Sequence, residues 1–255
     1  MAGAGDGETA PARRAEPVAG SARSVTCIVM AYNEEGTLAE AVEDVHAALA
    51  AFGDRAFEIL VVDDGSTDRT PEIGRELELR HPEVRLLRHG RNLGPGSAIL
   101  TGIRNSRCDV ICFHPADQQV DFRQIAGFIP LLDEADIVVG SRSGRPGYTQ
   151  LRMLASHVYI GLAHALFGLE EYDDFNFIYL YRRELFDGMP IESDGVFLCT
   201  EVLVRALDRG ARAVRVEAEC LPRRVGVSGC FRAPVIGKTF GQMARFWWRR
   251  RAGRT

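Results

Sequence analysis

Apolar residues recur along the chain with two different periods. Continuous apolar runs at 24–30 and 57–63 have the composition of strands that are buried on both faces of a sheet. The segment between them has the period of an amphipathic helix, with apolar positions four, three and four residues apart at Leu38, Val42, Val45 and Leu49. Thr70 and Pro71 predict an N-cap followed by proline in the first turn of a second helix.

This alternation continues to about residue 140 and then loosens. The remaining strands are expected at 84–88, 109–113, 136–139 and 213–219. The helices are expected at 38–49, 70–79, 97–105, 122–132, 150–167, 200–209 and 235–248. Strands that alternate with helices indicate an α/β, Rossmann-like fold, in which one mostly parallel sheet is flanked by helices in a single domain. In such sheets, ligands bind beyond the carboxyl ends of the strands.

Polar clusters follow three of the predicted strands. They begin at Tyr32 (Tyr-Asn-Glu-Glu), at Asp63 (Asp-Asp-Gly-Ser-Thr-Asp) and at His114 (His-Pro-Ala-Asp-Gln-Gln). Any one of them is also typical of a turn followed by a helix cap. Three at the same sheet edge favour a ligand site. The ligand is either a divalent metal that bridges carboxylates and phosphates, or the base and ribose of a nucleotide.

The chain has an acidic body and a basic carboxyl-terminal segment. Residues 223–255 contain eight arginines, one lysine and no acidic residue, so the preceding residues carry an excess of thirteen negative charges within the net charge of −4. Such a segment indicates an anionic membrane, a phosphate-bearing substrate or nucleic acid, although no nucleic-acid-binding motif accompanies it. The hydrophobic content of 46% and the charged content of 26% exclude disorder, collagen and coiled coil for the chain as a whole.

The lack of a recognisable targeting signal and the cysteine usage together predict a cytoplasmic protein. No apolar run reaches the roughly 18 residues that cross a bilayer, and residues 1–23 have no apolar signal-peptide region, so we expect them to form a disordered leader. The six cysteines include no CxxC pair and are expected to be reduced thiols.

Several sequence blocks resemble family 2 glycosyltransferases with the GT-A fold. The blocks VMAYNEE at 29–35, VVDDGSTDRT at 61–70 and NLGPGSA at 92–98 resemble the opening of that family. The blocks GSR at 140–142, DFN at 174–176, LYRR at 180–183 and PRRVGVS at 222–228 resemble its dolichol- and polyprenyl-phosphate mannosyltransferase branch. The resemblance implies a GT-A domain at 24–232. It also implies an inverting transfer of a sugar from a GDP- or UDP-sugar donor to a polyprenyl-phosphate acceptor.

The resemblance also implies a nucleotide and metal site. The family pattern Asp-x-Asp-x-Gln is matched here by Pro115-Ala-Asp-Gln-Gln. Asp117 and Gln119 would hold Mg²⁺ or Mn²⁺, whereas Pro115 replaces the first carboxylate and offers no ligand. His114 is a candidate replacement ligand, but neighbouring strand residues point to opposite faces, which favours a packed or exposed ring. The residues that the resemblance places at the donor are Tyr32, Glu34, Asp64, Ala116 and Gln119.

Arginines are implied at the phosphates of donor or acceptor. Arg142 and Arg152 have this role by resemblance, since a guanidinium fork matches two phosphate oxygens; the alternative is that each is a solvated surface arginine. Arg223 and Arg224 are candidates for the same phosphate. A phosphate acceptor is already an anion and needs no general base. The expected catalytic residues are Asp117, Arg142 and Asp174. Asp174 is expected as a base if one is used, and equally as a residue that orients an arginine or caps a helix.

Residues 233–255 combine aromatic and basic side chains at helical spacing. This pattern is typical of a helix that lies on anionic lipid, at the inner face of the membrane, and equally of a helix that packs its aromatic face on the domain.

Two other functions of the protein remain open. One is transfer to a soluble hydroxyl acceptor, such as a polysaccharide or a small metabolite. The other is nucleotide binding without transfer, for which Pro115 is the main argument.

Overall fold

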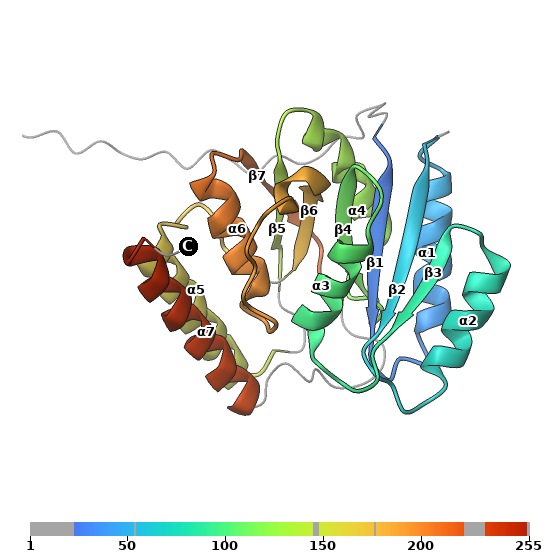
Figure 1. Cartoon of the computed structure of the whole chain (residues 1–255), viewed down its shortest axis with the longest axis horizontal. Coiled ribbons are helices and arrows are strands. Elements are labelled where there is room, and N and C mark those ends of the chain that lie inside the picture. Colours follow the sequence, from blue (N-terminus) through green and yellow to red (C-terminus); the bar gives the residue numbers. More distant parts are fainter. Residues whose placement is uncertain (1–22, 54, 145–147, 176, 222–232, 254–255) are drawn as a thin grey trace, which may run out of the picture.

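One seven-stranded sheet organises the protein. The computed structural model describes residues 23–53, 55–144, 148–175, 177–221 and 233–253 (Figure 1). The strand order is β3-β2-β1-β4-β6-β5-β7, in which only β6 is antiparallel to its neighbours β4 and β5. The strands are β1 (Val25–Ala31), β2 (Phe57–Asp63), β3 (Val84–Arg88), β4 (Val110–Pro115), β5 (Ile137–Arg142), β6 (Ile178–Arg182) and β7 (Ala213–Ala218). The predicted mostly parallel α/β sheet is confirmed.

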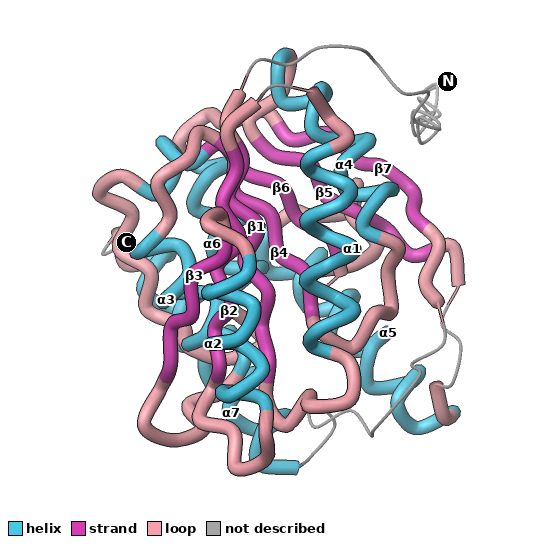
Figure 2. Tube along the Cα trace, turned by 90° about the vertical axis from the view of Figure 1, so that its right-hand side faces the viewer, coloured by secondary structure: helices cyan, strands magenta, loops and turns pink. Residues whose placement is uncertain are grey.

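Helices cover both faces of the sheet (Figures 1 and 2). One face packs against α1 (Leu38–Ala50), α2 (Thr70–Arg80) and α4 (Phe122–Phe128). The other face packs against α3 (Pro95–Asn105), α5 (Gln150–Phe167), α6 (Leu198–Asp208) and α7 (Ala233–Arg251). Two short 3-10 helices, Ile129–Asp133 and Arg183–Phe186, complete the described elements.

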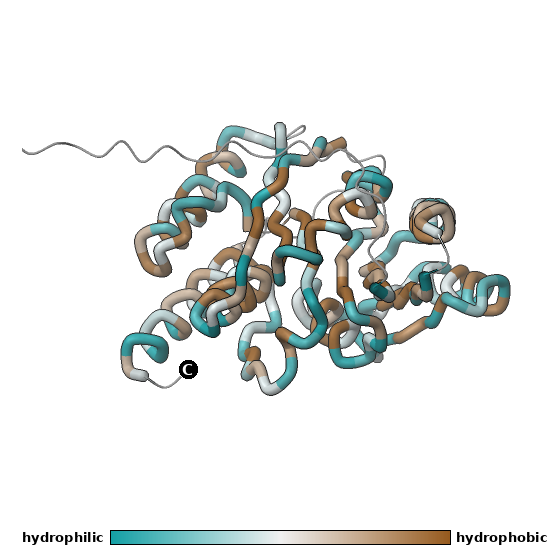
Figure 3. Tube along the Cα trace, turned by 90° about the horizontal axis from the view of Figure 1, so that it is seen from above, coloured by the Kyte–Doolittle hydropathy of each residue, from teal (hydrophilic) through white to brown (hydrophobic). Residues whose placement is uncertain are grey.

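The alternation of side chains along the central strands explains the two layers. In β1, Cys27 and Val29 belong to the hydrophobic cluster under α1, whereas Ile28 belongs to the cluster on the opposite face. All three are completely buried, so the strand presents a continuous apolar run rather than an alternating one. The outer helices differ from this strand, because hydrophilic and hydrophobic residues alternate along them (Figure 3).

Two sequence expectations need correction, and one strand was missed. The helix expected at 122–132 divides into α4 and a 3-10 helix, because Pro130 has no amide hydrogen to continue the α-helical pattern. Strand β6 was not predicted from the sequence. Thr70 is not an N-cap: Arg69 takes that position without a side-chain bond, and the hydroxyl of Thr70 accepts the amide hydrogen of Glu34 at 2.8 Å.

Helix α7 packs its apolar face on the domain. Met243 and Phe246 are buried in the same core cluster as the α5 and α6 residues, and the ring of Phe246 lies 5.6 Å from that of Phe167. At the end of the helix, Arg250 pairs with Asp208 at 2.7 Å. This is the second of the two arrangements expected for the segment. The boundaries predicted at 24–232 and 233–255 stay predictions, and the leader expected at 1–23 lies outside the described residues apart from Arg23.

None of the described helices is long and apolar enough to cross a membrane. The five cysteines that the structure describes are free and buried, and Cys230 lies outside the described residues.

Candidate active site

The three polar clusters meet at one edge of the sheet, as the sequence predicted. The amide of Asp64 donates to the carbonyl of Ala31 at 2.9 Å, which joins the ends of β2 and β1. The amide of Ala116 donates to the carbonyl of Met30 at 3.1 Å, which joins the ends of β4 and β1. This carboxyl-terminal edge is the lower side of the sheet in Figure 1.

The first two clusters are joined by hydrogen bonds between their loops. Asn33 has a left-handed backbone with φ of 54°, its amide donates to the hydroxyl of Ser66, and its side-chain oxygen accepts the amide of Thr67, both at 2.9 Å. These bonds fix the positions of its neighbours. Tyr32 is 44% exposed at the edge, and the carboxylate of Glu34 accepts the hydroxyl of Thr37 at 2.9 Å.

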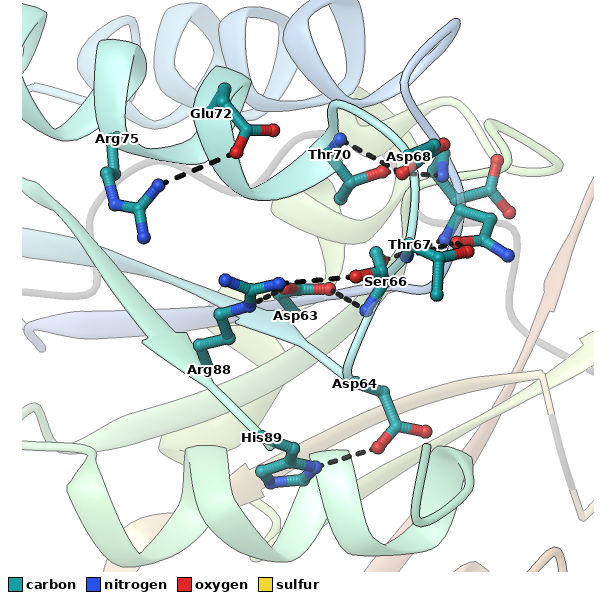
Figure 4. A network of polar contacts seen from close by, with 12 residues as sticks. Asp63, Asp64, Ser66, Thr67, Asp68, Thr70, Glu72, Arg75, Arg88 and His89 are labelled. Carbon is teal, nitrogen blue, oxygen red and sulfur yellow. Dashed lines mark hydrogen bonds and ion pairs between the residues drawn. The ribbon is translucent and has the colours of Figure 1, made fainter. Parts of the chain in front are cut away.

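Asp64 holds the loop that precedes α3, and Figure 4 shows its contact with His89. One of its oxygens accepts the amide of Leu93 at 2.9 Å and contacts Nδ1 of His89 at 2.7 Å, and the other accepts the amide of Gly94 at 2.7 Å. The second ring nitrogen of His89 contacts the hydroxyl of Thr101 at 2.8 Å. A carboxylate has about four acceptor positions, so three bonds leave roughly one for a ligand. The predicted nucleotide contact of Asp64 stays a prediction.

Gly65 allows the same loop to approach the end of β2. Its φ is +73°, and a Cβ atom at this position would lie 2.3 Å from the carbonyl carbon of Arg91. Beside it, the carboxylate of Asp63 is fully buried, accepts the amide of Ser66 at 2.9 Å and lies 3.0 Å from Nε of Arg88 (Figure 4). The Asp-Asp-Gly-Ser block therefore sets the geometry of two loops at once.

The third cluster places Asp117 and Gln119 next to each other. Asp117 is buried, and one of its carboxylate oxygens accepts the amide of Gln119 at 3.2 Å. The carbonyl of Gln119 accepts the amide of Leu221 at 2.8 Å. Ala116 also lies at this edge, but its side chain is buried in the core.

Gln118 was not foreseen as a site residue. Its backbone has a positive φ of 53°, its side chain is 6% exposed, and neither amide atom has a hydrogen-bond partner in the part of the chain that the structure describes. A buried amide without a partner costs about 1–3 kcal/mol, which points to a ligand that satisfies it. An unusual backbone conformation of this kind has no signal in the sequence.

His114 is packed inside the domain. Its side chain is buried, and its ring meets that of Phe122 edge-on at 5.4 Å. Burial lowers the pKa of His114 to about 4, against the smaller opposing effect of Asp117, so the ring is neutral near pH 7. The packed position favoured by strand alternation is confirmed.

These residues fit a divalent metal that has few protein ligands. Asp117 supplies a carboxylate, and the next residue, Gln118, has a buried side-chain oxygen without a partner among the described residues. Pro115 supplies none. Mg²⁺ commonly binds through one or two carboxylates together with phosphate oxygens and water, so a single carboxylate suits a metal that arrives with a diphosphate.

A second group of predicted residues surrounds Tyr148. Arg142 lies 3.0 Å from Asp174 as a buried ion pair, and it donates a hydrogen bond to the hydroxyl of Tyr148. Burial is the largest single effect and opposes the charge of Arg142, but Asp174, Tyr148 and Cys220 together outweigh it and raise the pKa of Arg142. The guanidinium carbon of Arg152 lies 3.7 Å from the centre of the Tyr148 ring. Tyr148, which sequence analysis missed, therefore brings the two arginines together.

A cavity of about 190 Å³ opens beside this group. Arg142, Arg152 and Asp174 form its polar end. Its other lining is largely apolar and comes from α5, from α7 and from the segments that precede β6 and α6: Ala155, Tyr159, Ile160, Ile236, Phe240, Phe175 and Val196. A cavity with a cationic end and apolar walls suits a ligand that is itself amphiphilic. Arg223 and Arg224 lie outside the described residues, so their predicted role is not examined by the structure.

The chain is similar in sequence to known proteins over most of its length. Glycosyltransferase AglD of Haloferax volcanii is 27% identical over 92% of this chain and 39% of its own length. The dolichol-phosphate mannosyltransferase of Pyrococcus furiosus is 28% identical over 88% of this chain and 63% of its own length. The chain thus spans less than two thirds of either relative.

Solved structures share the fold. Glucosyl-3-phosphoglycerate synthase from Mycobacterium tuberculosis, in complex with Mn²⁺, UDP-glucose and phosphoglyceric acid, superposes with a TM-score of 0.66, at 17% identity over 88% of this chain and 80% of that one. Mannosyltransferase PcManGT from Pyrobaculum calidifontis, with GDP-Man and Mn²⁺, gives 0.62 at 20% identity over 88% and 64%. Residues 26–205, well over half of the chain, match the model of Glycosyl transferase family 2. The chain belongs to this family and has the GT-A fold.

Proposed function

We propose that the protein is an inverting glycosyltransferase that transfers a sugar from a nucleotide-sugar donor to a polyprenyl phosphate. The cavity beside α5 and α7 carries this proposal, because its lining combines two arginines with largely apolar side chains. A polyprenyl phosphate has the matching chemistry, with a dianionic head and a hydrocarbon chain. The curated relatives, among them a dolichol-phosphate mannosyltransferase, support the same acceptor class.

The donor would bind at the carboxyl-terminal edge of the sheet. In this proposal, Tyr32, Glu34 and Asp64 contact the nucleoside, and Asp117 with Gln119 holds Mg²⁺ or Mn²⁺ against the diphosphate. The metal supplies charge neutralisation of the leaving group when it is bound. Ala116 would contact the donor only through its backbone, because its side chain is buried in the core.

The acceptor would need no general base. One oxygen of its phosphate attacks the anomeric carbon, and the bond from that carbon to the diphosphate breaks with its electron pair, which inverts the configuration. Asp174 lies against Arg142 and so serves to orient that arginine. No carboxylate among the described residues pairs with Arg152, so its charge is available to the phosphate.

An apolar stripe on α5 supports an acceptor that resides in a membrane. Leu151, Leu154, Val158 and Leu162 are all exposed, and their spacing of three, four and four residues places them on one face of the helix. Arg152 lies in the first turn of the same helix and lines the cavity. We propose that this stripe contacts the bilayer surface, with the cavity open toward the lipid headgroups and α7 contributing its exposed basic residues.

A transfer assay tests the acceptor. The full chain is incubated with radiolabelled GDP- or UDP-sugars, with Mn²⁺ or Mg²⁺, and with polyprenyl phosphate or a soluble phosphorylated acceptor. Labelled product in the organic phase is the expected result. Product with the soluble acceptor alone would refute the lipid acceptor, and donor binding without turnover would leave a nucleotide-binding protein.

Variants of the arginines sharpen this assay. Arg152→Gln removes a charge-assisted contact worth about 1.5–3 kcal/mol, so the KM for polyprenyl phosphate should rise by roughly 10-fold to 100-fold. Arg75→Gln is the matched control, because Arg75 is an exposed arginine whose ion pair with Glu72 lies on the surface of α2. An unchanged KM in Arg152→Gln would remove Arg152 from the acceptor site.

Vesicle flotation tests the α5 stripe. The double variant Leu151→Gln, Leu154→Gln should float less with anionic vesicles than the unchanged chain. Leu79→Gln is the control, because Leu79 is 89% exposed but lies on α2, outside the stripe. If the double variant and the control float equally well, α5 does not provide the membrane contact.

A further inference from the structure

A cluster of metal-ligating side chains lies at the edge of the sheet opposite the candidate active site. His46 is in the second half of α1, His81 follows α2 directly, and Glu83 precedes β3. Since α1 and α2 both begin at the carboxyl-terminal edge of the sheet, these residues lie toward its amino-terminal edge. One ligand atom from each of the three lies within 4.8 Å of the other two.

The spacing of this cluster suits a tetrahedral metal. Nε2 of His46 lies 3.4 Å from Oε2 of Glu83. Zinc bound to nitrogen and oxygen at about 2.0–2.2 Å separates two tetrahedral ligand atoms by roughly 3.4 Å, so the pair needs little movement to bind it. The rings of His46 and His81 have centroids 4.3 Å apart. Two charged rings would repel at this distance, whereas neutral imidazoles are what a metal requires.

A neighbouring carboxylate orients one of the rings. Nε2 of His81 lies 3.1 Å from Oε1 of Glu43, which also accepts a hydrogen bond from Arg80 at 2.8 Å. If Nδ1 of His81 binds the metal, this contact becomes the hydrogen bond that commonly fixes a zinc-bound imidazole. Glu43 would thus fix the orientation of the His81 ring from outside the ligand set.

We propose that His46, His81 and Glu83 form a zinc site with water as the fourth ligand. Two imidazoles and one carboxylate are a ligand set typical of Zn²⁺ rather than of Mg²⁺ or Mn²⁺, which prefer oxygen. The side chains are between 16% and 36% exposed, which leaves a path for the ion and for water. The bound metal would join α1, α2 and the start of β3, and so stabilise the half of the sheet that carries Asp64.

Zinc binding by the full chain tests this proposal. The protein is freed of metal with a chelator, dialysed against about 10 µM zinc and analysed for bound metal, and Co²⁺ replaces zinc for a visible spectrum. We expect one zinc ion per chain and the d–d bands of tetrahedral Co²⁺. The midpoint of thermal unfolding should rise by about 5 °C or more when zinc exceeds its dissociation constant roughly a hundredfold.

Variants distinguish zinc binding at this cluster from zinc binding elsewhere in the chain. His81→Gln and Glu83→Gln should each bind zinc at least 10-fold more weakly, while His157→Gln, at an exposed histidine on α5, should bind it normally. Asp117→Asn should also bind normally, so the result does not depend on the proposed donor site. Glu83 is the most exposed of the three, so its variant stays informative if a histidine variant fails to fold.

Two results would overturn the proposal. One is the absence of bound zinc in the unchanged chain. The other is undiminished zinc binding by both folded variants. In either case, His46 contacts Glu83 and His81 contacts Glu43 without a metal, and these contacts stabilise the helix ends.

Discussion

Replacing Gly65 by alanine tests how closely the loop at 91–94 packs on the end of β2. Gly65 has a φ of +73°, and the added Cβ atom would lie 2.3 Å from the carbonyl carbon of Arg91 and 2.7 Å from the amide nitrogen of Asn92. Both contacts involve backbone atoms, so no side-chain rotation relieves them. Either the turn after Asp64 or the loop must move.

The expected cost has two parts. A side chain in the left-handed region costs about 1–2 kcal/mol, and a backbone shift forced by overpacking costs about 1–3 kcal/mol. The free energy of unfolding should therefore fall by about 2–5 kcal/mol. For a chain of this size, the midpoint of thermal unfolding should fall by roughly 5–15 °C.

Two other glycines separate these parts. Gly53 also has a positive φ, +93°, but a Cβ atom there meets nothing within 4 Å, and at Gly36 there is neither a positive φ nor a contact. Thermal unfolding should rank Gly36→Ala as harmless, Gly53→Ala as mildly destabilising and Gly65→Ala as the least stable. If Gly65→Ala and Gly53→Ala unfold within about 2 °C of each other, the close approach to Arg91 is refuted.

Three further predictions concern other parts of the fold. His114 has a folded pKa of about 4, below its ordinary 6.5, so its contribution to stability is complete above pH 6.5 and is lost as the pH falls toward 4. The free energy of unfolding measured with urea should therefore be about 2 kcal/mol lower at pH 5 than at pH 7. The variant His114→Phe should remove this part of the pH dependence. Asp174→Asn leaves Arg142 without its buried counter-charge, so stability should fall by about 3–5 kcal/mol, and transfer should fall even at saturating donor. Phe246→Ala should lower the free energy of unfolding by about 3–5 kcal/mol, because the ring is buried. Trp248→Ala, at a side chain that is 70% exposed, should change this free energy by less than about 0.5 kcal/mol. Equal losses in the two variants would contradict the packing of α7.

Much of the sheet could be predicted because burial on both faces leaves a plain mark in the sequence. The strand at 57–63 and the helix at 150–167 have the bounds that the structure shows. Strand β6 was missed because five residues between a loop and a 3-10 helix carry too little periodicity. Its pairing with β4 and β5 depends on residues distant in sequence, so no local pattern announces an antiparallel strand inside a mostly parallel sheet.

The candidate site was predicted only as far as strand ends predict it. Because parallel strands end at one edge, Asp64 and Asp117 had to lie near each other. The sequence gives no comparable rule for side chains from loops and helices, and so Tyr148 was missed although it contacts Arg142 and Arg152. Thr70 shows the same limit in reverse, since its residue type suits a helix cap but its hydroxyl holds Glu34 instead.

The two arginines of the cavity differ in their charge pairing, which the amino-acid composition does not reveal. Arg142 has Asp174 as a buried counter-charge, so the pair is close to neutral and rigid. Arg152 lies over the ring of Tyr148 and lines the same cavity. A phosphate that enters would therefore meet one fixed donor of hydrogen bonds and one positive charge that has no acidic partner in the described part of the chain. The first suits positioning and the second suits attraction of the anion, so loss of Arg152 should weaken binding while loss of Asp174 should impair the transfer step itself.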